Sequence, residues 1–236
     1  MANPKLFRIV DHGVSEYAMI EEGDRILIGA SGGKDSTALV EYFGSRLKRP
    51  SGPRFEAAAL HVSTEIGSPL APSLAARFDS WGIPLHTVIL SVLGRLKPGR
   101  KMNCWWCSTQ RRTELNEFAM REGYNKIALG HHLDDILETL LMNALTKGEL
   151  STMPPRLSYE KYPITIIRPL CLADIPTIVR HATERGYISS TCTCTYQDNS
   201  GRKEARSRLE ALTGGRYDEK RKLFEALRNV KTDYLP

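Results

Sequence analysis

Short apolar segments alternate with helical segments along most of the chain, and this alternation constrains the fold more than any other feature of the sequence. The apolar segments, expected as strands, are residues 25–30, 55–62, 86–90, 126–130 and 164–167. The segments with helical spacing of apolar residues are 37–47, 73–81, 113–122, 134–145 and 175–185. Strands joined by helices of this length form a parallel, doubly wound sheet with helices on both faces. The sequence therefore predicts an α/β fold with a mostly parallel sheet.

The chain is expected to form a single domain over residues 1–236. We expect an amphipathic N-terminal helix within residues 1–22, an α/β core over residues 23–190 and a helical C-terminal extension over residues 191–236. Ligands of doubly wound sheets bind at the carboxyl ends of the strands. The turns that follow the first and fourth strands are therefore the expected location of a site.

Composition and charge exclude several classes of protein. Apolar residues make up 41% of the chain and charged residues 25%, which is ordinary for a globular protein. No segment approaches the roughly 20 apolar residues of a membrane helix, and no apolar signal region follows the first residue. The formal net charge is +6, from 33 Lys and Arg against 27 Asp and Glu, which favours an anionic partner. We therefore expect a cytoplasmic protein that does not bind a membrane.

A glycine-rich turn, Ser31-Gly-Gly-Lys-Asp-Ser36, joins the first strand to its helix. Adjacent glycines let backbone N–H groups wrap phosphate oxygens, and the helix that follows presents its positive end. Lys34 adds charge, and Asp35 is suited to a Mg²⁺ ion held between it and the phosphates. The turn is one residue too short for a Walker loop, and no dinucleotide fingerprint is present. A phosphate site of another type is favoured over a surface turn with incidental charge.

The five cysteines include two close pairs, Cys104-Trp-Trp-Cys107 and Cys192-Thr-Cys194. An odd number of cysteines with such pairs does not indicate a disulfide framework. The chemistry alone leaves three readings open, which are a four-thiolate zinc site, a [4Fe-4S] cluster on three thiolates with an open fourth iron, and thiols that bind no metal. Cys171 stands between two leucines and is expected to be a buried apolar thiol.

Two further segments carry polar groups that the fold would place near the turn. The segment Gly130-His-His-Leu-Asp-Asp135 follows the fourth strand, where its acids could cap a helix or position Mg²⁺ or a substrate. Residues 95–112 contain six Lys or Arg, no acid, and Trp105 and Trp106. This mixture of cations and aromatic rings favours an RNA-facing rim over a solvated basic loop.

Taken together, these motifs resemble the N-type ATP pyrophosphatases (PP-loop enzymes) and, among them, the tRNA 2-thiocytidine synthetase family. The segments that carry the resemblance occur in the family's order and are 31–36, 104–112, 129–139, 153–155 and 168–170. The resemblance spans about residues 25–230 and implies an adenine nucleotide alpha hydrolase-like fold. It also implies an enzyme that adenylates C2 of a tRNA base, expected to be a cytidine of the anticodon loop, and replaces the oxygen by sulfur. AMP and pyrophosphate would be released.

The resemblance also assigns roles to residues. The residues expected to bind ATP are Gly29, Ala30, Ser31, Gly32, Gly33, Lys34, Asp35, Ser36, His61, Val62, Gly130 and Asp134. Asp135 is expected to be catalytic, and Arg111 and Lys34 are expected to stabilise charge in the transition state. Cys104, Cys107 and Cys192 are expected to hold the [4Fe-4S] cluster, with Cys194 as a rival to Cys192.

The expected partners are tRNA and a sulfur donor such as a cysteine desulfurase or free sulfide, and the family resemblance suggests a homodimer. Two other functions compete with this one. The first is a PP-loop adenylating ligase or amidotransferase-like enzyme with a structural zinc. The second is a non-catalytic module that binds nucleotide and RNA and senses redox state.

Overall fold

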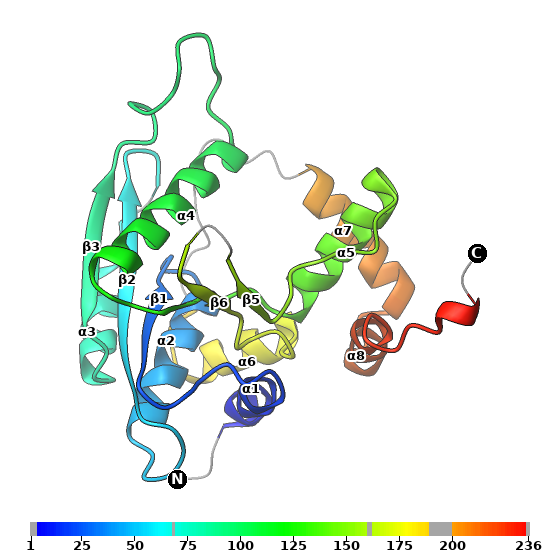
Figure 1. Cartoon of the computed structure of the whole chain (residues 1–236), viewed down its shortest axis with the longest axis horizontal. Helices are drawn as coiled ribbons and strands as arrows, with labels where there is room; N and C mark the ends of the chain where they lie inside the picture. Colours follow the sequence, from blue (N-terminus) through cyan, green and yellow to red (C-terminus); the bar gives the residue numbers. More distant parts are fainter. Residues whose placement is uncertain (1–3, 68, 160–161, 189–199, 235–236) are drawn as a thin grey trace.

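The computed structural model describes the chain except for residues 1–3, 68, 160–161, 189–199 and 235–236 (Figure 1). Its helices and strands are, in chain order, α1 (Lys5–Glu16), β1 (Asp24–Gly29), α2 (Lys34–Leu47), β2 (Phe55–Thr64), α3 (Pro72–Ser80), β3 (Leu85–Leu90), α4 (Cys104–Arg121), β4 (Lys126–Ala128), α5 (Leu133–Lys147), β5 (Arg156–Ser158), β6 (Thr165–Ile167), α6 (Ile175–Glu184), α7 (Ser200–Thr213), α8 (Tyr217–Ala226) and the 3₁₀ turn η1 (Thr232–Tyr234). The predicted alternation of strands and helices is confirmed.

The described strands form one sheet in the order β3-β2-β1-β4-β6-β5. Every neighbouring pair is parallel except β5 with β6, which is antiparallel. The predicted α/β class is therefore confirmed, with one strand that the sequence analysis missed. β5 has three residues, none of them fully buried, so it carries no apolar run to signal it. Pairing with β6 fixes it as an edge strand.

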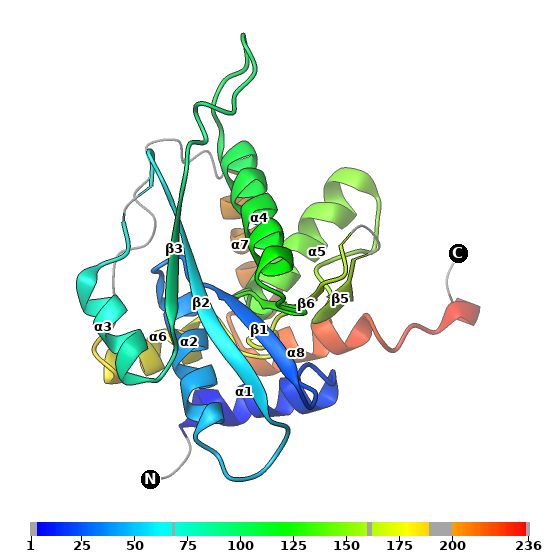
Figure 2. The same ribbon diagram turned by 60° about the vertical axis from the view of Figure 1, so that its left-hand side comes forward.

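Each face of the sheet has its own apolar core (Figures 1 and 2). Alternate residues of a strand point to opposite faces, and β1 shows this directly. Ile26 and Ile28 pack into the larger core, to which α1, α2, α3, α5, α6, α7 and α8 contribute. Leu27 points the other way, into a smaller core that α4 covers with Phe118 and Ala119. Helices on both faces were predicted, and the structure confirms them.

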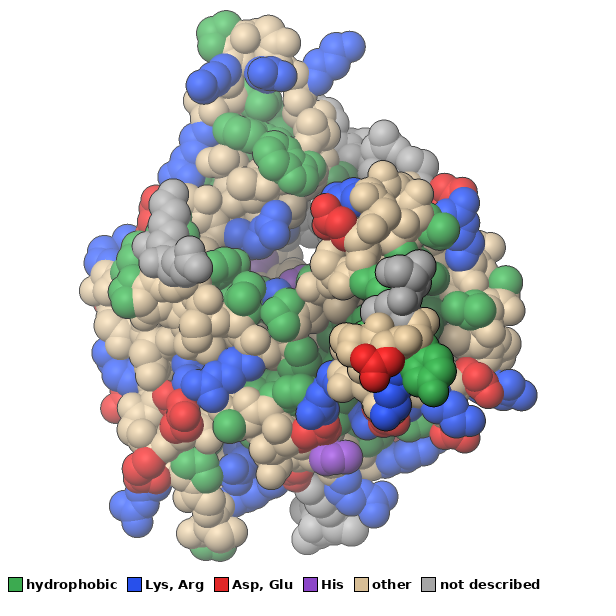
Figure 3. Space-filling model, turned by 45° about the vertical axis from the view of Figure 1, so that its right-hand side comes forward, with side chains coloured by type: hydrophobic (Ala, Val, Ile, Leu, Met, Phe, Trp, Pro, Cys, Tyr) green, Lys and Arg blue, Asp and Glu red, His purple; other side chains and the backbone are tan. Residues whose placement is uncertain are grey.

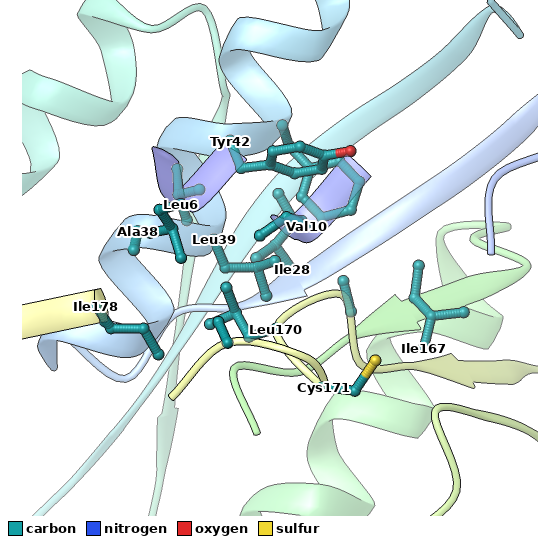
Figure 4. Close-up of a cluster of buried hydrophobic side chains, with 14 of the residues drawn as sticks. Leu6, Val10, Ile28, Ala38, Leu39, Tyr42, Ile167, Leu170, Cys171 and Ile178 are labelled. Atoms are coloured by element: carbon teal, nitrogen blue, oxygen red, sulfur yellow. The ribbon is translucent and has the colours of Figure 1, made fainter. Parts of the chain in front are cut away.

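Part of the larger core is shown in Figure 4, where side chains of α1, β1, α2 and the segment after β6 meet. Cys171 lies in this core with no exposed surface. Burial among apolar groups raises the pKa of its thiol to about 12. The expectation of a buried apolar thiol at this position is confirmed.

Helix α4 begins nine residues before the expected start at Thr113. Asn103 is the N-cap, and its side-chain oxygen accepts a hydrogen bond of 2.9 Å from the N–H of Trp106. The sequence of α4 begins Cys-Trp-Trp-Cys and has little apolar periodicity, which is why the pattern did not show its start. Cys104 and Cys107 lie in the first turn of this helix, in a segment to which the sequence analysis gave no secondary structure.

None of the helices in the described part of the chain is both long enough and apolar enough to cross a membrane.

Candidate nucleotide and cysteine site

The glycine-rich turn lies between β1 and α2, at the carboxyl edge of the sheet. Gly32 has a φ of +83°, a conformation that favours glycine. Gly33 is the N-cap of α2, and it has no side chain to occupy the first N–H groups of that helix. The hydroxyl oxygens of Ser31 and Ser36 are 3.0 Å apart, and Ser36 donates to the Gly33 carbonyl at 3.1 Å. The turn is thus held open, with backbone donors available to an anion.

Asp35, in the first turn of α2, has one carboxylate oxygen engaged and one without a hydrogen bond. Its Oδ2 accepts from Lys34 Nζ at 3.0 Å. Its Oδ1 is buried and has no hydrogen-bond partner among the described residues. A buried carboxylate oxygen without a donor is costly unless a cation or donor reaches it. This oxygen fits a Mg²⁺ ion bound between Asp35 and phosphate oxygens.

A pocket of about 270 Å³ opens beside the turn. It is lined by Gly29, Ala30, Ser31, Asp35, Ser36, Leu60, Val62, Arg111, Leu115, Leu129, Gly130 and His131. Gly130 is required here for space, because a Cβ atom at this position would lie 3.1 Å from the backbone nitrogen of Ser36. The apolar walls Leu60, Leu115 and Leu129 were not anticipated, although Leu129 directly follows β4. The pocket combines apolar walls with a phosphate-binding turn.

His61 and Val62 lie in the C-terminal half of β2 and make different contacts. His61 is buried and its Nδ1 forms a hydrogen bond of 2.8 Å with the Ala30 carbonyl, so its side chain braces the start of the turn. Burial lowers the pKa of His61. Val62 lines the pocket, and its carbonyl accepts a hydrogen bond of 3.0 Å from Arg111 Nη2. Arg111 of α4 is thereby brought to the pocket.

The N-terminus of α5 follows β4 on the same edge and is capped by a reciprocal pair. The His132 ring nitrogen Nδ1 accepts from the N–H of Asp135, and Asp135 Oδ2 accepts from the N–H of His132 at 3.2 Å. The neighbouring His132, His131 and Arg202 lower the pKa of Asp135 despite the opposing effect of burial. His131 lines the pocket, and burial lowers its pKa to about 4. His131 is therefore neutral near pH 7.

Asp134 lies where the sequence analysis did not place it. Its carboxylate is buried and forms an ion pair of 2.8 Å with Lys220 Nζ of α8. The other oxygen accepts from the N–H of Ile175 at 2.9 Å. Neither Asp134 nor Asp135 is among the residues that line the pocket. The Asp134 carboxylate links α5 with α6 and α8 inside the protein.

Cys104 and Cys107 lie in the first turn of α4, and both are half-buried. Because they are three residues apart, they share one side of the helix. Cys192 and Cys194 lie outside the described residues. Two thiols at helical spacing suit a shared metal, although the described residues alone contain no group of three or more ligands that could hold one. Trp105 is 69% exposed, whereas Trp106 donates from Nε1 to the Val92 carbonyl at 3.1 Å.

The loop between β3 and α4 rises away from the sheet and carries exposed cations (Figures 1 and 2). Arg95, Lys97, Arg100 and Lys101 are all exposed. In Figure 3 the surface is hollowed beneath the upper lobe, and histidine surface is visible within the hollow with Lys or Arg at its rim. The exposed cations of this loop favour the approach of a large anion.

The parallel sheet, the open glycine turn and the pocket beside it define a nucleotide-binding α/β protein of the PP-loop class. No protein-family model matches the chain. The chain is 35% identical to the tRNA-cytidine(32) 2-sulfurtransferase of Anaeromyxobacter sp. (strain Fw109-5), over 98% of this chain and 77% of that protein. It is 33% identical to the protein of the same name from Methylococcus capsulatus (strain Bath), over 98% and 81%. The chain belongs to the tRNA-cytidine(32) 2-sulfurtransferase family, and the resemblance read from the sequence is confirmed.

Solved structures show the same fold. The U34-tRNA thiolase NcsA from Methanococcus maripaludis, solved with its [4Fe-4S] cluster, has a TM-score of 0.75 and 22% identity, covering 96% of this chain and 79% of that one. The NMN synthetase from Francisella tularensis has a TM-score of 0.56 and 14% identity, covering 93% and 92%. The PP-loop type of fold expected from the sequence is thereby confirmed.

Proposed function

We propose that this protein is an ATP-dependent tRNA sulfurtransferase that replaces the C2 oxygen of a tRNA cytidine by sulfur. The observation that carries the proposal is one pocket lined by the phosphate turn, by Gly130 and His131, and by Arg111 of the helix that begins with the cysteine pair. Arg111 follows Cys107 by four residues, about 6 Å along a helix axis. Arg111, which lines the proposed ATP pocket, is therefore about one helical turn from Cys107.

The chain's own groups suit the adenylation step. Backbone N–H groups at the start of α2 would bind phosphate oxygens, and Asp35 would hold a Mg²⁺ ion that accompanies them. The C2 oxygen of the base attacks the α-phosphorus of ATP, the bond to the bridging oxygen breaks, and pyrophosphate leaves. Lys34 and Arg111 stabilise the charge that develops on the phosphoryl oxygens. Asp135 orients the reacting groups from the N-terminus of α5.

The second step exchanges oxygen for sulfur at C2. A sulfur nucleophile forms a bond to C2, the C2–O bond breaks, and AMP leaves with the oxygen. Cys104 and Cys107 would hold a [4Fe-4S] cluster together with Cys192, for which Cys194 is the rival. Such a cluster supplies an open iron that binds sulfide. The cluster named for NcsA, a fold relative, and the helical spacing of the first two thiols support this assignment.

The proposed partners of the protein are tRNA, a sulfur donor and a second copy of the chain. The names of the family members support tRNA as the substrate, and the basic loop after β3 would contact its phosphates. Sulfur would come from a cysteine desulfurase or free sulfide. The protein would act in the cytoplasm, with a homodimer as the oligomeric state to test.

Anaerobic purification with iron, sulfide and zinc analysis, followed by an assay of tRNA thiolation, tests the proposal. We expect a brown protein with about four irons per chain and 2-thiocytidine in digests of tRNA after reaction with ATP and sulfide. Cys104→Ser is expected to lose both the cluster and thiolation. Cys171→Ala is the matched control, because Cys171 is buried in the apolar core, and it should retain both.

Two outcomes would contradict the proposal. A colourless protein with one zinc and no thiolation would favour the adenylating ligase. ATP binding without pyrophosphate release in the presence of tRNA would favour the redox sensor.

A further inference from the structure

Helix α5 carries three acidic side chains in its first two turns, and each is paired with a cation from the C-terminal helices. The pairs are Asp134 with Lys220 at 2.8 Å, Asp135 with Arg202 at 3.3 Å and Glu138 with Arg206 at 2.7 Å. In Figure 1, α7 lies beside α5 and α8 lies near its N-terminal end. The C-terminal extension is therefore bound to the helix that carries the candidate catalytic acid.

The three pairs differ in how deeply they are buried, and this difference separates the acids fixed inside the protein from the one that remains accessible. The side chains of Asp134 and Lys220 are 5% and 4% exposed, and that of Glu138 is 1% exposed. Arg202 is 46% exposed and its partner Asp135 is 15% exposed. The first and third acids are fixed inside the protein, where a countercharge is needed for stability. Asp135 is the acid that remains accessible, and Arg202 is the cation beside it.

The two oxygens of Asp135 have separate partners. Oδ2 accepts from the backbone N–H of His132 at 3.2 Å and lies 3.4 Å from His132 Nε2. Oδ1 pairs with Arg202 Nη1 at 3.3 Å. A carboxylate held at one oxygen can still rotate about its Cβ–Cγ bond, whereas one held at both oxygens has a fixed plane. Arg202 therefore supplies the second point that orients this carboxylate.

We propose that Arg202 is a positioning residue of the adenylation site, acting through Asp135. The inference rests on the proposed function, in which Asp135 serves the reaction of ATP with the tRNA base. It gives the C-terminal extension a part in that reaction. Arg202 comes from α7, 67 residues away in the chain, so the orientation of the acid depends on docking of α7 against α5.

Steady-state pyrophosphate release with ATP and tRNA tests this role in Arg202→Gln and Arg202→Lys. Arg202→Gln is expected to lower kcat about tenfold while the KM for ATP changes less than about threefold, because misorientation of a catalytic group acts on the reaction step. Arg202→Lys keeps the charge and should recover part of the loss. An unchanged kcat in Arg202→Gln would overturn the proposal, as would a rise in KM alone.

Arg208→Gln is the matched control on the same helix. Arg208 pairs with Glu204 of α7 at 2.6 Å, both side chains are exposed, and its loss should leave kcat unchanged. Thermal unfolding of each variant separates positioning from folding, since Arg202→Gln should unfold close to the wild-type temperature. Arg206→Gln leaves the buried Glu138 unpaired and should unfold at a lower temperature.

A double-variant cycle separates this inference from the proposed function. In Asp135→Asn, which should itself be slow, adding Arg202→Gln is expected to cost nothing further. A further tenfold loss would show that Arg202 acts elsewhere and would overturn the inference alone. Full activity of Asp135→Asn would contradict both the inference and the proposed role of Asp135.

Discussion

The nucleotide edge of the sheet and the cysteine end of α4 are built differently. The nucleotide edge consists of the glycine turn, β2 and the N-terminus of α5, where hydrogen bonds of 3.0, 2.8 and 3.2 Å join buried and partly buried groups. At the cysteine end, Cys104 and Cys107 are half-buried, Trp105 is exposed, and a basic loop rises from the sheet.

The difference indicates that the nucleotide edge is a rigid site and that the cysteine end of α4 is an accessible one. Groups that bind phosphate and stabilise transition-state charge act best when they are already oriented. A cysteine end that receives sulfur and a tRNA base has to stay accessible. We therefore expect changes on one side to leave the function of the other side intact.

The largest expected effect is that ATP binding and iron content are lost separately, each through a variant in a different region. Asp35→Ala should weaken Mg·ATP binding about 10- to 100-fold, as for a lost charge-assisted contact, while the iron content stays at the wild-type level. Cys107→Ser should lose the iron and thiolation while its affinity for ATP stays within about twofold of wild type. Calorimetric ATP titration and iron analysis measure both. Loss of ATP binding in the Cys107→Ser protein would show that the two regions are not independent.

A smaller effect is expected from Gly130→Ala, which tests the rigidity of the nucleotide edge. The added Cβ would lie 3.1 Å from the Ser36 nitrogen and 3.3 Å from the Asp35 carbonyl carbon, both backbone atoms that cannot move without opening the turn. Overpacking of this kind costs about 1–3 kcal/mol of unfolding free energy, which urea unfolding measures.

Gly201→Ala of α7 is the matched control for Gly130→Ala. Its added Cβ meets only Met142 Cε at 3.8 Å, so no loss of stability is expected there. A Gly130→Ala protein as stable as wild type, with unchanged ATP affinity, would mean that the turn adjusts easily and is not rigid.

The smallest expected effect concerns Trp105 at the accessible side. Trp105→Ala should change the unfolding free energy by less than about 0.5 kcal/mol, because the ring is 69% exposed. It should weaken tRNA binding about fivefold, near the lower end of the values for base stacking. Trp106→Phe, which removes the hydrogen bond to Val92, is the contrasting variant and should reduce stability. Equal tRNA affinity in Trp105→Ala would remove Trp105 from the tRNA-binding surface.

Sequence reasoning located the features whose geometry is local. The alternation of segments predicted the parallel sheet, and the glycine-rich turn was predicted between the first strand and its helix, where the structure has it. It failed where local pattern was weak. β5 is too short to show a strand pattern, and the weak apolar periodicity of α4 hid the start of the helix.

The sequence by itself determined the phosphate turn, the spacing of the cysteine pair and the class of fold, because these depend on residues close together in the chain. Only the tertiary structure decided which acid of α5 is buried and which stays partly exposed. Asp134 and Asp135 are adjacent and chemically alike, but their partners Lys220 and Arg202 lie 86 and 67 residues away. Burial and pairing with distant cations gave the two acids different environments, and nothing in the neighbouring sequence encodes that difference.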